Sequence, residues 1–257
     1  MYVYRHKLPE SEETMNNKKW GTDMSEFMDL VSKSKLMPMS RWEPYTGVHI
    51  THRHTGKMAG LASISTSPLT NKYCVCRSKN PELICSHCYS NEMQKQYSDL
   101  EKCLRKNSEI LYYTMLSPCE MPRLSSPSGF FRWESFGDLA TTIQVANYFH
   151  MTAANPKLQF ALWTKNPFLI ALAMNQYGLY KPENLTIIVS SPKLNDADRT
   201  MYDKYDFIDY VFTVYEPDYI REHGIIINCG ARSCKGCHKC YTQEHDTVDI
   251  AEKLKNI

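Results

Sequence analysis

Four cysteines near the end of the chain lie close enough in sequence to bind one metal centre. Cys229, Cys234, Cys237 and Cys240 follow the spacing C-x4-C-x2-C-x2-C. Structural zinc sites usually take their ligands as C-x2-C pairs that lie well apart in sequence, whereas a continuous run of cysteines is typical of loops that hold an iron–sulfur cluster. Four thiolates would suit a structural or electron-transfer cluster. We therefore expect an iron–sulfur cluster here, with zinc or four metal-free structural thiols as the alternatives.

A second group of cysteines, Cys74, Cys76, Cys85 and Cys88, has a looser spacing. Cys85 and Cys88 form a C-x2-C pair directly before a predicted helix, whose N-terminus favours anionic thiolates. Cys74 and Cys76 would point to opposite faces of an extended chain, and we favour Cys76 as the third ligand. Three thiolates on a four-iron cluster would leave one iron open to a small molecule, by analogy with catalytic zinc sites. A closed zinc site on all four cysteines is the alternative.

Strands and helices are predicted to alternate around these cysteines. The predicted strands are residues 60–67, 130–134, 158–163, 185–189 and 210–214, with 225–227 as a possible sixth. The predicted helices are residues 23–35, 90–116, 139–154, 168–177, 196–205 and 246–256. Strands separated by helices form a parallel sheet with right-handed crossovers. Because the strands are fewer than the eight of a closed barrel, we expect an α/β fold with a partial (β/α) barrel.

Several polar residues follow the predicted strands. Glu134, Gly137 and Asp138 come after the second strand, Lys165 after the third and Ser190 after the fourth. The carboxyl ends of parallel strands meet at one edge, where β/α folds bind their ligands. We expect these residues to bind a cofactor or substrate there. The alternatives are that Asp138 caps the following helix, that Lys165 is an ordinary exposed lysine and that the serines belong to a turn.

Composition limits the class of protein. The chain has 257 residues, of which 42% are hydrophobic, and this is enough for a sizeable core. Its 30 basic and 28 acidic residues give a formal charge of +2, so net charge does not indicate nucleic acid or anionic lipid as a partner. We find no signal-peptide pattern and no apolar run long enough for a membrane span, and we expect a cytoplasmic protein. In that compartment ten cysteines favour metal over disulfides.

Two resemblances follow from these motifs. A cysteine triad that ends in Cys85-Ser86-His87-Cys88-Tyr89, after the first predicted strand, resembles the radical S-adenosylmethionine (SAM) superfamily. The first gap departs from the usual motif, because eight residues separate Cys76 from Cys85 where the superfamily has three. Residues 60–241 also look like a family of phage and bacterial proteins related to gene product 88. The segments that carry this likeness are 85–89, 132–138, 163–167 and 229–241.

The resemblance implies a partial barrel of the radical SAM type at residues 58–222, preceded by an N-terminal extension (1–57) and followed by an auxiliary-cluster segment (223–257). It implies a catalytic [4Fe-4S] cluster on Cys76, Cys85 and Cys88, a second cluster on the four C-terminal cysteines, and SAM as cofactor. The turn around Glu134 would touch the methionine amino group of SAM. Reductive cleavage of SAM, with an electron donor such as a flavodoxin or ferredoxin, would start radical chemistry on an unknown substrate. The rival hypothesis is a nonenzymatic module with two zinc sites that binds nucleic acid or protein.

Overall fold

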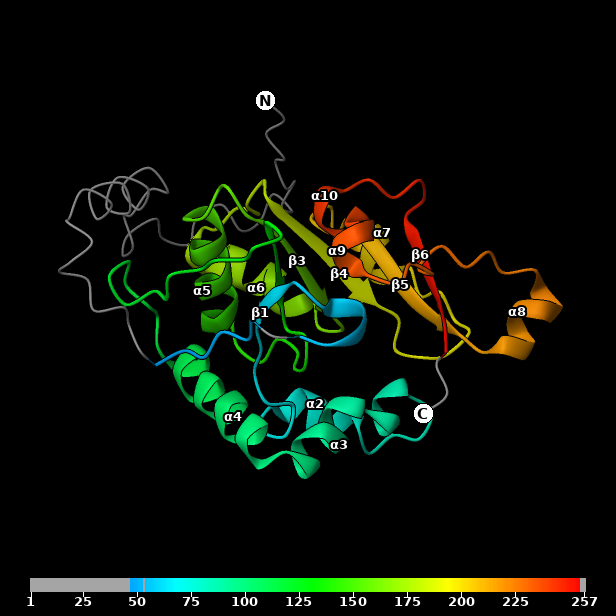
Figure 1. Ribbon diagram of the computed structural model, residues 1–257, viewed down its shortest axis with the longest axis horizontal. Helices are drawn as coiled ribbons and strands as arrows, with labels where there is room; N and C mark the ends of the chain where they lie inside the picture. The colour runs from blue at the N-terminus through cyan, green and yellow to red at the C-terminus, as the bar shows by residue number, and fades with distance from the viewer. Residues whose placement is uncertain (1–46, 53, 255–257) are drawn as a thin grey trace, which may run out of the picture.

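The fold is an α/β fold built on a parallel sheet, as predicted. The computed structural model describes residues 47–52 and 54–254, so the predicted helix 23–35 lies outside the described residues. Six parallel strands pair in the order of the sequence (Figure 1). They are β1 (Ala62–Ile64), β2 (Phe130–Trp133), β3 (Gln159–Thr164), β4 (Leu185–Ser190), β5 (Tyr210–Tyr215) and β6 (Asp249–Lys253). β1 and β6 are the two edges, and no pairing between them closes the sheet within the described part of the chain.

Helices precede or follow the strands along the whole sheet. Between β1 and β2 lie α2 (Lys72–Arg77), the 3-10 turn η3 (Ile84–His87), α3 (Tyr89–Gln96) and α4 (Ser98–Tyr113). The later connections contain α5 (Thr142–Ala153), α6 (Phe168–Tyr177), α7 (Thr200–Lys204), α8 (Pro217–His223), α9 (Cys234–Cys237) and α10 (Lys239–Thr242), and the turn η2 (Gly56–Met58) precedes β1. None of the described helices is long and apolar enough to cross a lipid bilayer.

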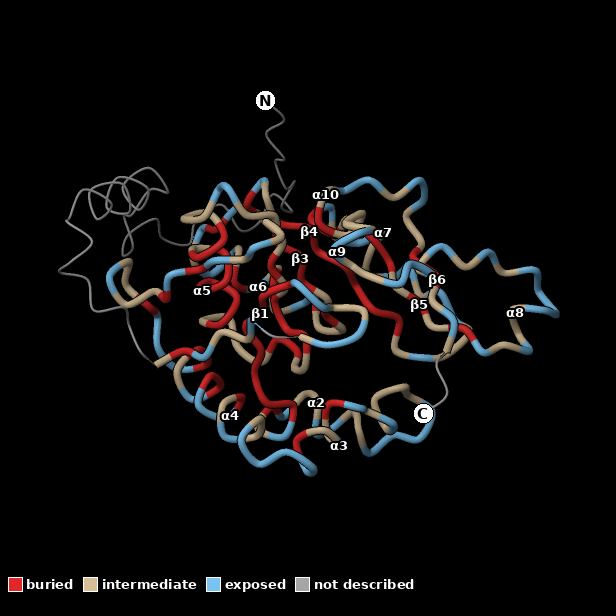
Figure 2. Tube along the Cα trace, in the orientation of Figure 1, coloured by how far each residue is buried: buried red, intermediate tan, exposed pale blue. Residues whose placement is uncertain are grey.

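The two faces of the sheet are covered by different parts of the chain. Because side chains alternate along a strand, Phe131 and Trp133 of β2 point into the main core beneath α4, α5 and α6. Phe130 belongs to the opposite face, together with Trp163 of β3. That face is covered by the segment containing α9 and α10, whose Tyr241 is buried among these residues. Figure 2 shows β4, in the centre of the sheet, as buried along its length.

The end of the chain differs from the prediction. Residues 246–256 were expected to form a helix, but Asp249–Lys253 is the strand β6, which pairs with β5 and buries Ile250 and Ala251. The expected strand 225–227 is irregular. Pairing with β5 therefore decides the conformation of this segment, because the five residues of β6 carry too little helical periodicity to resist it.

Two predicted helices are shorter than expected. The helix predicted for 90–116 is divided into α3 and α4 by Tyr97, whose backbone is extended at φ −121° and ψ 95°. This break lets α3 follow the cysteine loop while α4 packs in the main core. The helix predicted for 196–205 begins only at Thr200. By contrast, α6 spans the predicted residues and ends at Gly178, which adopts the left-handed conformation that suits glycine at a helix end.

Candidate functional site

The first cysteine group lies in the connection that leaves the carboxyl end of β1. Two hydrogen bonds tie α2 to the loops after β2 and β3: Asn71 Nδ2 donates to the carbonyl of Asp138 at 2.9 Å, and the Tyr73 hydroxyl donates to the carbonyl of Lys165. Asn71 also caps α2 by accepting from the Tyr73 amide at 2.9 Å. These bonds place the cysteine loop against the carboxyl edge of the sheet, and α3 begins directly after Cys88, as predicted.

Cys74, rather than Cys76, is the partly buried cysteine of α2. Burial raises the pKa of the Cys74 thiol, and the negative charges of Asp138, Cys88 and Cys85 raise it further. Cys76 is exposed. Our preference for Cys76 assumed an extended chain, but both cysteines lie on α2, and the side of the helix that faces the fold belongs to Cys74. The geometry therefore favours Cys74 as the third thiol.

Glu134 sits in a closed hydrogen-bond network directly after β2. Its side chain is 2% exposed, and Oε1 accepts from Tyr148 at 2.5 Å, from Gln144 at 2.6 Å and from the Thr66 hydroxyl at 2.9 Å. Oε2 accepts from the Thr66 amide at 3.0 Å. Burial raises the pKa of Glu134 to about 7, although these bonds oppose the shift. The carboxyl group holds the turn together, and contact with a cofactor would require it to exchange one of these bonds.

Gly137 is required by this network. A Cβ at this position would lie 2.4 Å from Glu134 Oε2 and 2.6 Å from the carbonyl oxygen of Thr66. No side chain fits there without moving backbone atoms. The sequence pattern identified the turn, but it did not show that the glycine serves a buried carboxyl group.

Asp138 joins the ends of β2 and β3. Its Oδ1 accepts from the Thr164 hydroxyl at 2.5 Å, and its Oδ2 accepts from the amide of Lys165 at 3.0 Å. The alternative that Asp138 caps the following helix is wrong, because Thr141 is the N-cap of α5. The Lys165 ammonium makes no ion pair within the described residues, and its positive charge lowers the pKa of Cys74. Lys165 is thus a cation beside the first cysteine group.

The remaining strand-end candidates lie farther along the same edge. Ser190 ends β4 and is 8% exposed, and its hydroxyl makes no hydrogen bond to another described residue. Ser191 is committed to the fold, because its hydroxyl bonds with that of Thr213 at 2.9 Å and accepts from the Asp198 amide at 3.2 Å. Of the two serines, Ser190 is the one available to a ligand.

The second cysteine group surrounds a small cavity against the far face of the sheet. Cys229, Cys234, Cys237 and Cys240 all line this cavity, whose volume is about 30 Å³, together with Trp163. The turn forms because Ser233 caps α9 by accepting from the Gly236 amide at 3.3 Å. His238, at φ 45°, then redirects the chain into α10. Burial raises the pKa of Cys240 to about 12, and the other three thiolates contribute to the rise.

The cysteines of both groups are suitable ligands for a soft metal, but they are not arranged around a single ion. All eight cysteines of the two groups are free thiols, which are the ligands that zinc and iron–sulfur clusters prefer. Within the described residues, however, no three Cys, His, Asp or Glu side chains converge closely enough to hold a metal ion. The cavity of about 30 Å³ is also only about the size of one water molecule. Loading either group therefore requires its side chains to rearrange.

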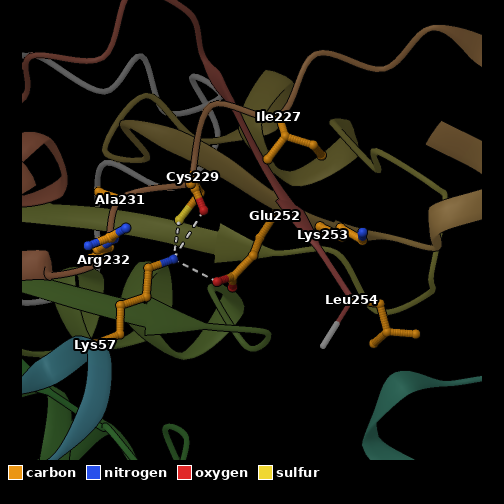
Figure 3. Close-up of a pocket in the computed structure, with 9 residues that line it drawn as sticks. Lys57, Ile227, Cys229, Ala231, Arg232, Glu252, Lys253 and Leu254 are labelled. Atoms are coloured by element: carbon orange, nitrogen blue, oxygen red, sulfur yellow. Dashed lines mark hydrogen bonds and ion pairs between the residues drawn. The ribbon is translucent and has the colours of Figure 1, made fainter. Parts of the chain in front are cut away.

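Lys57 is a site residue that the sequence did not reveal. Its ammonium donates to Glu252 Oε1 at 2.7 Å, to the carbonyl of Cys229 at 3.1 Å and to Cys229 Sγ at 3.3 Å (Figure 3). These residues line an open cavity of about 720 Å³ that also includes Arg232 and Lys253. Lys57 comes from η2, 172 residues before Cys229, in a segment without any metal-ligand pattern. It fell inside the predicted N-terminal extension, yet it contacts the second cysteine group.

No protein-family model, curated protein or solved structure matches this chain. The resemblance to radical SAM proteins and to proteins related to gene product 88 therefore stays a prediction from motifs.

Proposed function

We propose that this protein is an iron–sulfur enzyme of the radical SAM type that cleaves SAM to start radical chemistry on a substrate. The observation that carries the proposal is that Cys74, Cys85 and Cys88 lie in one connection at the carboxyl edge of a parallel sheet, beside the cation of Lys165, which makes no ion pair within the described residues. Three thiols with a neighbouring cation suit a cofactor that carries a carboxylate. We place this cluster on Cys74 rather than Cys76.

The sheet supports this proposal through its topology. Each strand pairs in parallel with the strand that follows it in sequence. The helical connections therefore gather on one face of the sheet, and the C-terminal cysteine segment covers the other face. We interpret this arrangement as a partial (β/α) barrel that lacks the closing strands. The ligand edge is the one at which the loops after β1 to β4 meet.

A three-thiolate [4Fe-4S] cluster would supply an open iron for SAM and the electron for its reductive cleavage. The protein residues provide position and charge. Lys165 would pair with the carboxylate of SAM, and the hydroxyl of Ser190 would donate a hydrogen bond to it. Asp138 holds the backbone of Lys165 in place through the bond of 3.0 Å. A flavodoxin or ferredoxin would deliver electrons, and the second cysteine group would hold an auxiliary cluster.

A structural zinc at the second cysteine group is the competing assignment for that site, and the small cavity favours it. Four thiolates around one tetrahedral ion need less space than four thiolates around a cubane. This assignment changes the role of the C-terminal segment but leaves the first cysteine group open to iron.

Metal content and electron paramagnetic resonance of the anaerobically purified full-length protein test the proposal. We expect about eight irons per chain with two clusters, or about four irons and one zinc if the second site is structural. Adding SAM to the dithionite-reduced protein should shift the signal of the first cluster and release 5′-deoxyadenosine. Cys85→Ala should abolish both effects. Zinc in both sites, or iron without any response to SAM, would refute the enzymatic proposal.

A further inference from the structure

Arg132 extends from β2 onto the face of the sheet that carries the second cysteine group. It is paired in register with Ser63 of β1 and Ala161 of β3, so its neighbours on both sides are small. The guanidinium stacks on Trp163, with Cζ 3.9 Å from the centre of the ring. This cation–π contact holds the guanidinium flat over the sheet and restricts its rotamers.

Arg132 lies between the two cysteine groups. On one side, its stacking partner Trp163 packs against the same buried cluster as Cys234 and Cys240. On the other side, Ser63 Oγ is 3.1 Å from Ser135 Oγ, and the carbonyl of Ser135 accepts from the Tyr89 hydroxyl at 2.5 Å. Tyr89 directly follows Cys88. A molecule bound at Arg132 would therefore lie between the first cysteine loop and the second.

The positive charge of Arg132 is not neutralised by any described carboxylate. Within the described residues it makes no ion pair, and its Nε is buried without a hydrogen-bond partner. The contact found for Nη1 is the sulfur of Met58 at 3.7 Å, which is a weak acceptor. A buried guanidinium nitrogen without an acceptor is costly, because it has lost its water and gained nothing in return. An anion would satisfy it.

Neutral hydrogen-bonding groups stand next to this cation. His54 Nε2 lies 2.8 Å from Ser63 Oγ, and Ser63 is the register neighbour of Arg132. The fully buried Ser63 hydroxyl holds the imidazole in place, and the second ring nitrogen of His54 can donate to an oxyanion, whereas the planar guanidinium offers two parallel donors. Together they form a cationic, donor-rich patch backed by the apolar surface of Trp163.

We propose that Arg132, with His54, binds an anionic group of the substrate, either a carboxylate or a phosphate, and holds the substrate between the two cysteine groups. The identification of the bound molecule as the substrate rests on the proposed function, but the anion site itself does not. Trp163 covers one side of the guanidinium, so the anion approaches it from another side.

Isothermal titration calorimetry of the full-length protein tests the site with two probes, inorganic pyrophosphate and succinate, in the absence of SAM. We expect saturable binding of at least one probe, and the preferred probe separates a phosphate site from a carboxylate site. Arg132→Gln should weaken that binding by about 10- to 100-fold, because a charge-assisted pair of hydrogen bonds is lost. Arg132→Lys should retain an intermediate affinity, since it keeps the charge without the planar fork. The matched control is Arg123→Gln, which removes an exposed arginine.

Three results would overturn this inference. The first is that Arg132→Gln binds the probe as tightly as the natural sequence does, and the second is that neither probe binds the natural sequence saturably. The third is that Arg132→Gln loses the second metal centre but still binds the probe. The last result would make Arg132 a counter-charge for that centre. Arg132→Lys keeps the test valid if Arg132→Gln does not fold, because wild-type affinity for both probes in the lysine variant would equally refute bidentate recognition. Failure of SAM cleavage alone would refute the proposed function and leave the anion site standing.

Discussion

The buried carboxyl group of Glu134 predicts an unusual dependence of stability on pH. Its pKa is about 7 in the folded protein and close to 4.5 when the chain is unfolded. Between these values the folded state binds the extra proton, so the free energy of unfolding falls as pH rises. The interval between the two values corresponds to about 3 kcal/mol, at about 1.4 kcal/mol per pH unit. This stabilisation is complete below pH 4.5 and is lost as pH rises through 7.

Glu134→Gln isolates this contribution. The glutamine oxygen can take the place of Oε1 and accept from Tyr148, Gln144 and the Thr66 hydroxyl, while its NH2 group then faces the Thr66 amide and loses that one bond. The variant should therefore lose the titration at a cost in stability that does not depend on pH. We expect its stability relative to the natural sequence to rise by about 2 to 3 kcal/mol between pH 5 and pH 8.

Urea denaturation at several pH values, with metal content matched, measures this difference. Other titrating groups are common to both proteins and cancel in the comparison. Glu109→Gln, which removes an exposed carboxylate on α4, is the control and should follow the natural sequence at every pH. Parallel stability curves for the natural sequence and Glu134→Gln would show that the carboxyl group does not titrate near pH 7, and would refute the reasoning.

Three further predictions concern the two cysteine groups and the turn. Cys74→Ala should abolish the effect of SAM on the electron paramagnetic resonance signal, whereas the exposed Cys76→Ala should keep it; the reverse result would restore Cys76 as the ligand. Lys57→Met should lower the reduction potential of an auxiliary cluster by about 60 to 130 mV in a redox titration, because the charged hydrogen-bond donor to the Cys229 sulfur is lost. An unchanged potential would show that Lys57 does not influence the cluster. Gly137→Ala should destabilise the protein by about 2 kcal/mol or more in urea, because its Cβ would meet backbone; Gly230→Ala, which meets nothing within 4 Å, is the control, and equal effects would argue against the clash.

The sequence predicted the sheet well where strands are buried on both faces. β4 contains the apolar run Ile187 to Val189, and all six of its residues are buried, so local composition and tertiary environment agree. The prediction failed at β6, where the apolar pair Ile250 and Ala251 is too short to show a period. Residues 249–253 form a strand because they pair with the edge of β5, which is distant from them in sequence. Such pairing is not encoded in a local pattern.

The candidate site shows the same division. Cysteine spacing identified both groups of thiols, since cysteines that lie close together in sequence stay close in the fold. The choice between Cys74 and Cys76 depended on whether the chain was extended or helical, and spacing alone does not decide it. Lys57 and Arg132 could not be recognised as candidate site residues from the sequence, because a single lysine or arginine belongs to no motif. Only their contacts in the structure identify them.

The C-terminal cysteine segment also covers an apolar part of the sheet. α9 and α10 have four residues each, too few to be stable helices in isolation, yet they cover Leu61, Ala161 and Trp163 on one face of the sheet. If a metal fixes this segment, its removal frees the loop and uncovers an apolar sheet surface. Chelated or oxidised protein would then aggregate before its core unfolds, so colloidal stability would report on metal loading.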